Sequence, residues 1–115
     1  MADDLLRVTT ATPDPASAQA LARSAVAAGL AGNAQVIGPV FVAYRHLGEL
    51  GEGSECQVVL STTRAAYPAL EQHILGNHPW QNPEITAIAL VEASQEYARW
   101  LREATTTSAD GPADA

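Results

Sequence analysis

Two prolines, Pro79 and Pro83, separate a segment of helical character from a segment of strand character. Proline lacks a backbone N–H and its ring clashes with the preceding helical turn, so neither a helix nor a central strand can run through both positions. Residues 78–83 read His-Pro-Trp-Gln-Asn-Pro and therefore predict a conformationally restricted loop. Because this loop joins a helix to a strand, it limits how the second half of the chain can be arranged.

The N-terminal part of the chain predicts a strand and then a helix. Residues 5–10 are rich in β-forming side chains and lead into a turn. Asp14 is placed to cap a helix whose first residue is Pro15, where the missing N–H costs nothing. Alanine and leucine recur at helical spacing from there, and Gly29 or Gly32 ends the helix.

The central part predicts a long β-hairpin. Residues 34–47 alternate as a strand, and the pair Gly38-Pro39 marks a bulge or a sheet edge. Residues 48–54 are interpreted as a polar, glycine-rich loop, and residues 55–63 as the returning strand. A solvated face of the hairpin is expected to carry its acidic residues, Glu49, Glu52 and Glu55.

The last part predicts a helix, a strand and a second helix. The first of these helices is either capped by Thr63, with a loose first turn because Pro68 removes a backbone donor, or starts nearer Tyr67. A strand over residues 84–91 follows the loop, and Ser94 caps the last helix. The apolar faces are Tyr67, Leu70 and Ile74 in one helix and Tyr97, Leu101 and Ala104 in the other.

The resulting order, βαββαβ followed by a helix, predicts an α+β fold of the ferredoxin-like type, with helices on one face of an antiparallel sheet. Residues 1–105 are expected to form a single domain and residues 106–115 a disordered polar tail. Apolar residues occupy both alternations of the strands, as Val58 and Leu60 do against Val59. The second sheet face therefore needs cover, and self-association is the simplest source.

Composition excludes several kinds of partner. The chain has 13 acidic residues, six arginines and no lysine, with a net charge of −7, so it lacks the basic surface that nucleic acids require. Apolar runs are broken well before the roughly 20 residues that cross a bilayer, so no membrane partner is expected. The single cysteine, Cys56, and the acidic N-terminus predict a cytoplasmic protein.

Several short motifs follow one another in a recognisable order. They are Thr9-Thr10 before Pro13-Asp14, Gly29-Leu30-Ala31, Tyr44-Arg45 before Gly48, Ser61-Thr62-Thr63, the loop from His78 to Ile85, and Tyr97 with Trp100. Through them the chain resembles the CutA family of divalent-cation tolerance proteins from Leu6 to Thr105. The resemblance implies a ferredoxin-like fold, a homotrimer, and a non-enzymatic role in divalent cation (copper) tolerance or metal binding.

The chain departs from the family pattern at positions that the resemblance places near the cleft between subunits. Ser61 stands where the family commonly has lysine, and Trp80-Gln81 stands where it has Tyr-Glu. Asn33 occupies a position that is often cysteine, and His46 one that is usually aromatic. A framework that is kept while its cleft is rewritten suggests a changed ligand.

His78 and His46 are the candidate metal ligands. His78 lies where two prolines restrict the backbone, and His46 would add a second imidazole to a copper or zinc site. The alternatives are that His78 caps the preceding helix and that His46 is a solvated hairpin residue. Cys56 has no second cysteine nearby, so a thiolate site for copper(I) is not expected, and no other cofactor is indicated.

The alternative function is a CutA scaffold recruited as an enzyme or small-molecule-binding protein in a biosynthetic pathway. No catalytic residue is assigned, but Arg45 would pair with a small anionic ligand and a histidine would move protons. Trp100 serves either in packing or in stacking on a ligand. The residues predicted to line the cleft are Tyr44, Arg45, His46, Ser61, Trp80 and Trp100.

Overall fold

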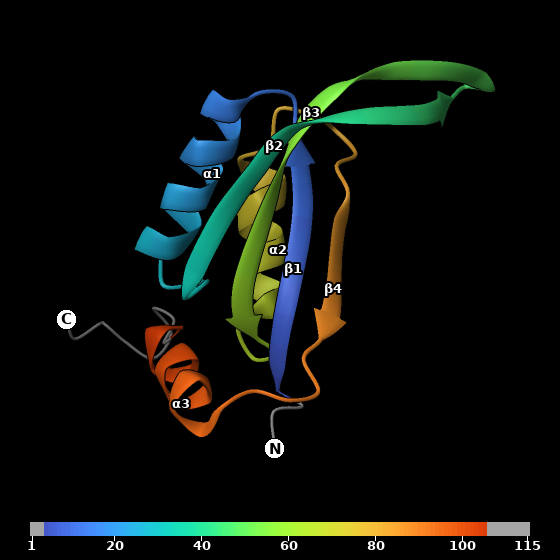
Figure 1. Ribbon diagram of the computed structural model, residues 1–115. Coiled ribbons are helices and arrows are strands. Elements are labelled where there is room, and N and C mark those ends of the chain that lie inside the picture. Colours follow the sequence, from blue (N-terminus) through green and yellow to red (C-terminus); the bar gives the residue numbers. More distant parts are fainter. Residues whose placement is uncertain (1–3, 106–115) are drawn as a thin grey trace.

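The computed structural model describes residues 4–105, in the element order βαββαβα (Figure 1). The elements are β1 (Leu5–Thr12), α1 (Pro15–Ala27), β2 (Asn33–His46), β3 (Glu49–Thr63), α2 (Tyr67–Gly76), β4 (Ile85–Ala89) and α3 (Gln95–Ala104). The strands form an antiparallel sheet in the order β2-β3-β1-β4. The predicted α+β class and element order are confirmed. The predicted tail, residues 106–115, lies outside the described residues, and the single-domain boundary stays a prediction.

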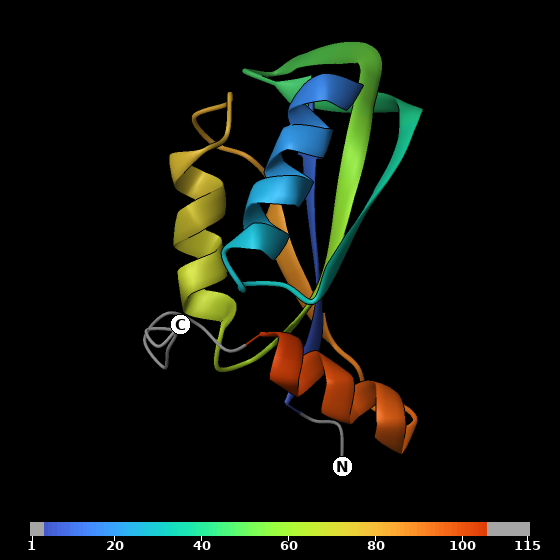
Figure 2. The same cartoon turned by 90° about the vertical axis from the view of Figure 1, so that its left-hand side faces the viewer.

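Helices α1 and α2 lie side by side against one face of the sheet (Figure 2). This face carries Leu6 and Val8 of β1 together with Val58 and Leu60 of β3, and all four side chains are buried. The helices contribute the buried side chains Ala18, Leu21, Ala22, Ala25, Leu70 and Ile74. The small residues of α1 let this helix approach the sheet closely, as its alanines predict. None of the three helices within residues 4–105 is long and apolar enough to cross a bilayer.

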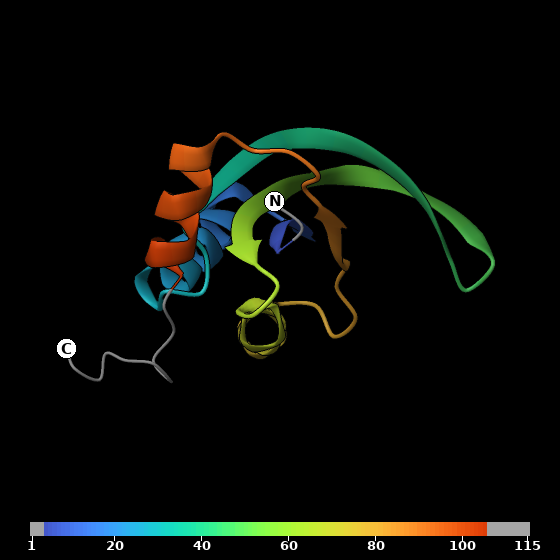
Figure 3. The same ribbon diagram turned by 90° about the horizontal axis from the view of Figure 1, so that it is seen from below.

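Helix α3 covers one end of the opposite sheet face, so helices lie on both faces rather than on the one face predicted (Figure 3). Leu5 points to this face because Leu6, the next residue of the strand, points to the other. Leu5 is buried against Ala98 and Leu101 of α3. Tyr97, which was predicted to face inward, remains 37% exposed. Ala98 takes the inward position instead, because it pairs with Leu101 at helical spacing.

Much of the rest of this face is exposed in the single chain, although Ala11 at its far end is buried. Arg7 lies on it beside Ile88 of β4, which is 60% exposed. Ile37 of β2 lies on the same face and is also exposed. The face is therefore largely uncovered away from α3, in agreement with the argument from strand alternation.

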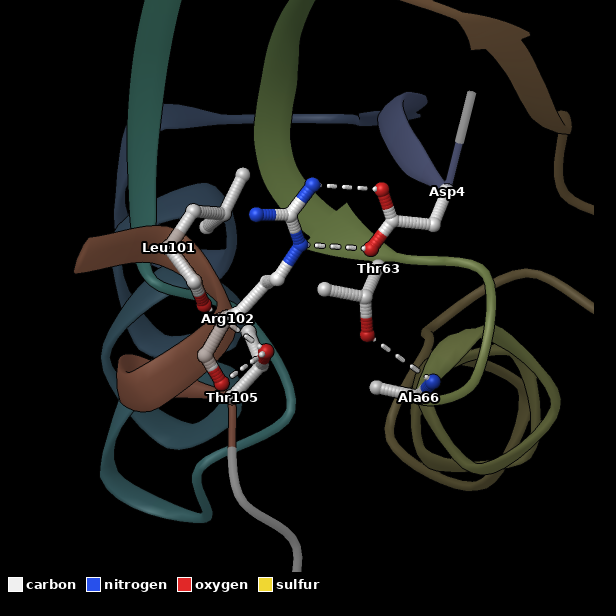
Figure 4. A network of polar contacts seen from close by, with 6 residues as sticks. All are labelled: Asp4, Thr63, Ala66, Leu101, Arg102 and Thr105. Carbon is white, nitrogen blue, oxygen red and sulfur yellow. Dashed lines mark hydrogen bonds and ion pairs between the residues drawn. The ribbon is translucent and has the colours of Figure 1, made fainter. Parts of the chain in front are cut away.

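A small polar network joins the beginning and the end of the described chain (Figure 4). Arg102 donates two hydrogen bonds to the Asp4 carboxylate, at 2.8 and 2.9 Å. This guanidinium lowers the pKa of Asp4 below its ordinary value. Nearby, the Thr63 hydroxyl accepts the Ala66 N–H at 3.2 Å, just before α2 begins at Tyr67, the later of the two predicted starts.

The hairpin differs from the prediction in its turn. Strand β2 ends at His46 and β3 begins at Glu49, so Leu47 and Gly48 alone connect them, and the predicted loop over residues 48–54 is wrong. Both turn residues have positive φ, 53° and 82°, a geometry that matches the twist of paired strands. Leu-Gly lacks the Asn or Asp that usually marks such a turn, and the glycines that follow are typical of loops.

The pair Gly38-Pro39 interrupts the pairing of β2 with β3, as predicted. The register shifts between Ile37 and Val40, whose partner is Glu55. Gly38 has φ of 142°, and a Cβ there would lie 3.0 Å from the carbonyl oxygen of Glu55, so the position requires glycine. Beyond this bulge the hairpin projects past the other strands (Figure 1).

Candidate functional site

A cleft of about 680 Å³ lies between the projecting hairpin and the proline-containing loop. Its hairpin wall is formed by Val42, Tyr44, His46, Gly53, Ser54 and Glu55, and its loop wall by Trp80, Gln81 and Asn82. The side chains of β2 in this wall are every second residue of the strand, because alternate side chains of a strand point to the same side. The cleft therefore uses one side of the hairpin.

The hairpin wall is shaped by a tyrosine that lies over a glycine. Tyr44 is paired with Gly51 on the neighbouring strand. A Cβ at position 51 would come within 2.4 Å of the Tyr44 ring, so the ring can take this position only because residue 51 is glycine. Gly51 thus leaves room for the Tyr44 ring over β3, and the ring remains 49% exposed.

Glu55 and His46 lie far apart, at opposite ends of this wall. Glu55 pairs with Val40 at the base of the projecting hairpin, and His46 pairs with Glu49 at its tip. Residues 40 and 46 are separated by six strand positions, which corresponds to roughly 20 Å. Glu55 and His46 therefore cannot act on the same small ion in this conformation.

The loop wall is held in place by His78. The Nε2 atom lies 2.7 Å from the carbonyl oxygen of Ala11, at the end of β1, and Nδ1 lies 3.1 Å from the backbone nitrogen of Trp80. A carbonyl can only accept and a backbone N–H can only donate, so Nε2 carries the proton and Nδ1 accepts. The His78 and Trp80 rings also contact each other, with centroids 5.5 Å apart.

These contacts give His78 a bracing role that was not predicted from the sequence. It does not cap α2, since the Asn77 side chain bonds the His73 carbonyl in the last turn of that helix, at 2.8 Å. Both ring nitrogens of His78 are already hydrogen-bonded, so a metal would have to displace one of these bonds. Metal binding by His78 with His46 stays a prediction, and it would require the loss of one of these hydrogen bonds.

The described residues also do not gather a larger set of metal donors. Within residues 4–105, no group of three or more His, Cys, Asp or Glu side chains is placed to hold a metal ion. Cys56 is buried on the helix-covered face of β3, away from the cleft wall. The residues that one described chain brings together therefore do not fit a metal centre with three protein ligands.

Three of the predicted cleft residues lie in the cleft, namely Tyr44, His46 and Trp80. The other three do not line it in this chain. Arg45 points to the opposite side of the hairpin, and its guanidinium donates to the Gly48 carbonyl at 3.1 Å. Ser61 and Trp100 lie elsewhere: Ser61 is buried in the sheet next to Arg7, and Trp100 lies against Gly32.

Glu55 is a cleft residue that was not predicted. It was expected to share one solvated face with Glu49 and Glu52, but strand alternation places Glu52 on the other side of the hairpin from Glu55. Glu55 is half-buried and lines the cleft, whereas Glu52 is exposed. The signal was the odd-even alternation of β3, which the incorrect loop assignment concealed.

Comparison with known proteins identifies relatives of this architecture. Residues 6–104 match the sequence family described as CutA1 divalent ion tolerance protein. The divalent-cation tolerance protein CutA of Thermus thermophilus is 33% identical over 93 residues, covering 81% of this chain and 90% of the relative. The solved structure of the divalent cation tolerance protein (Cut A1) from Thermus thermophilus superposes with a TM-score of 0.86 at 32% identity, covering 88% of this chain and 98% of that one. The structure of CutA from Synechococcus elongatus superposes with a TM-score of 0.86 at 32% identity, covering 90% of this chain and 92% of that one.

Proposed function

This chain belongs to the CutA1 divalent ion tolerance protein family, and on that premise we propose that it is a non-enzymatic, trimeric protein of divalent-cation tolerance. The observation that carries the proposal is the match of residues 6–104 to that family, which spans every element of the fold. Copper and zinc are the candidate ions, because imidazole and carboxylate are the available ligand types.

Two features support assembly as a homotrimer. The sheet face that carries Arg7 and Ile88 is largely uncovered away from α3. The projecting hairpin also exposes apolar residues, and Phe41 and Leu50 are 71% and 72% exposed. Apolar surface of this extent on a sheet and its hairpin is characteristic of an interface with another protein. A second and third copy of this chain would bury it.

Assembly would also bear on metal binding. One described chain pairs His46 with Glu49 at the hairpin tip but gathers no group of three or more donors, so a site with several ligands would combine side chains of more than one copy. An imidazole ligand must be neutral, so binding should weaken in mild acid. Binding is expected to be modest, since no preformed donor set is present in the single described chain.

Two measurements test the proposed function. Calorimetric titration with Cu²⁺ and with Zn²⁺ should show modest binding that is lost in His46→Ala and unchanged in Cys56→Ser. Expression in a copper-sensitive bacterial strain should raise the copper concentration that permits growth, and His46→Ala should remove the gain. If binding persists in His46→Ala and is lost in Cys56→Ser, the imidazole assignment is wrong. If the protein gives no growth advantage, the tolerance role fails.

The alternative of an enzyme or small-molecule-binding protein, using the cleft between subunits, stays a prediction, but Arg45 does not line the cleft within one chain. Arg45 was to pair with the anion, but its guanidinium lies on the other side of the hairpin, on the Gly48 carbonyl. Cytoplasmic localisation stays a prediction, and fractionation of cells that produce the tagged protein would test it.

A further inference from the structure

We propose that the cleft between the hairpin and the loop binds an organic cation, a protonated amine attached to an apolar or aromatic body. This goes beyond the cation-tolerance role and does not require a bound metal. The inference rests on the charge, the aromatic surface and the size of the cleft.

The charge of the cleft favours a cation. Glu55 is the carboxylate among the lining residues, and neither arginine nor lysine is among them. The nearest arginine in sequence, Arg45, is directed away and engaged with the turn. A half-buried carboxylate without a basic neighbour in its cleft attracts a positive charge and repels an anion. The net charge of −7 acts in the same direction.

The aromatic residues of the cleft provide a second attraction for a cation. Tyr44 and Trp80 lie on opposite walls and are 49% and 40% exposed, so their rings are accessible. The face of an aromatic ring attracts ammonium groups, and tryptophan does so best. Both rings already lie at the cleft in the single chain, since Gly51 leaves room for Tyr44 and His78 bonds the Trp80 backbone and contacts its ring. A preformed wall lowers the entropic cost of binding.

The remaining lining residues suit an amine that carries a larger body. Val42 adds apolar surface, and the side-chain oxygens of Gln81 and Asn82 can accept N–H donors. A volume of about 680 Å³ is within the range of small-molecule sites and far exceeds a bare ion. Glu55 and His46 are roughly 20 Å apart along the strand, so the cleft fits an extended molecule better than one metal ion.

The test uses three probes of nearly the same shape on the full-length protein: phenethylamine, phenylethanol and phenylacetate. Titration is followed by calorimetry and by the indole N–H signal of Trp80 in NMR spectra. Phenethylamine should bind about tenfold more tightly than the alcohol or the carboxylate, the size expected from one ion pair with an aromatic contact. Its signal changes should centre on Trp80 and the hairpin.

Two variants identify the carboxylate that recognises the amine. Glu55→Gln should weaken phenethylamine about tenfold and leave phenylethanol unchanged. Glu52→Gln removes the same charge from the other side of the hairpin and should change the affinity less than twofold. The proposal is overturned if phenethylamine shows no saturable binding at millimolar concentration, if phenylacetate binds as tightly, or if the two variants act alike. Trimer formation and metal titration are measured separately, so failure here leaves the proposed function standing.

Discussion

The body of the sheet and the hairpin that projects beyond residue 39 use the same two strands in different ways. In the body, Val58 and Leu60 are completely buried between the sheet and its helices. In the projecting hairpin, Phe41 and Leu50 are mostly exposed. Secondary structure is continuous through both regions, so the difference lies in what packs against them. The body is stabilised within one chain, whereas the hairpin depends on cross-strand pairs and, in our proposal, on other copies.

The largest effect is expected from Leu60→Ala in the body. The side chain is fully buried, and removing it should lower the free energy of unfolding by about 2–5 kcal/mol. The matched control is Leu75→Ala on α2, where leucine is 43% exposed and the loss should stay below about 1 kcal/mol. Urea unfolding of both variants gives the comparison. Equal losses would contradict the assignment of the core to the helix-covered face.

The second effect concerns the link between the body and the cleft. His78→Ala removes two hydrogen bonds and leaves the Ala11 carbonyl and the Trp80 N–H without this partner. The expected loss is about 1–3 kcal/mol, with increased motion of the Trp80 ring. His46→Ala at the hairpin tip removes the same side chain and should leave unfolding nearly unchanged. Thermal unfolding and the NMR line widths of Trp80 would distinguish the two variants. Equal behaviour would contradict the claim that His78 holds the loop in place.

The third effect concerns the backbone of the hairpin turn. Gly48 has φ of 82° and open space around it, so Gly48→Ala adds backbone strain but no clash. The expected cost is about 1 kcal/mol. Gly76→Ala, also in open space but at the end of α2, should be neutral or slightly stabilising. Hydrogen exchange of the hairpin amides would show the difference, and a silent Gly48→Ala would argue against the two-residue turn.

The smallest effect is expected from the ion pair between Asp4 and Arg102. Because the pKa of Asp4 is lowered in the folded state, its contribution is present above the ordinary aspartate pKa of about 3.9 and is lost as pH falls through the lower folded value. Both side chains are more than 40% exposed, so the contribution at neutral pH stays below about 1 kcal/mol. Asp4→Asn should flatten the stability profile in this acidic window, and an unchanged profile would show that the pair adds nothing.

The body of the sheet and the hairpin also differ in how well they could be predicted from the sequence. The element order, the Asp14 cap and the bulge at Gly38-Pro39 follow from local rules, and the structure agrees with them. The turn could not be predicted because Leu47-Gly48 has the glycine of the usual Asn-Gly or Asp-Gly turn but not the Asn or Asp. The predicted cleft between subunits stays a prediction, whereas the cleft within one chain depends on strand parity, which decides on which side Arg45 and Glu55 point.

The most direct test of the account is the mass of the protein in solution, measured by light scattering on a sizing column. One chain has a mass of 12.0 kDa, so a homotrimer has three times that value, or 36 kDa. We expect the trimer mass at micromolar concentration, and a shift toward the single-chain mass when the exposed Phe41 and Leu50 are both changed to serine. A wild-type protein that stays at 12.0 kDa and remains soluble would show that the hairpin needs no other copy, and would contradict the account.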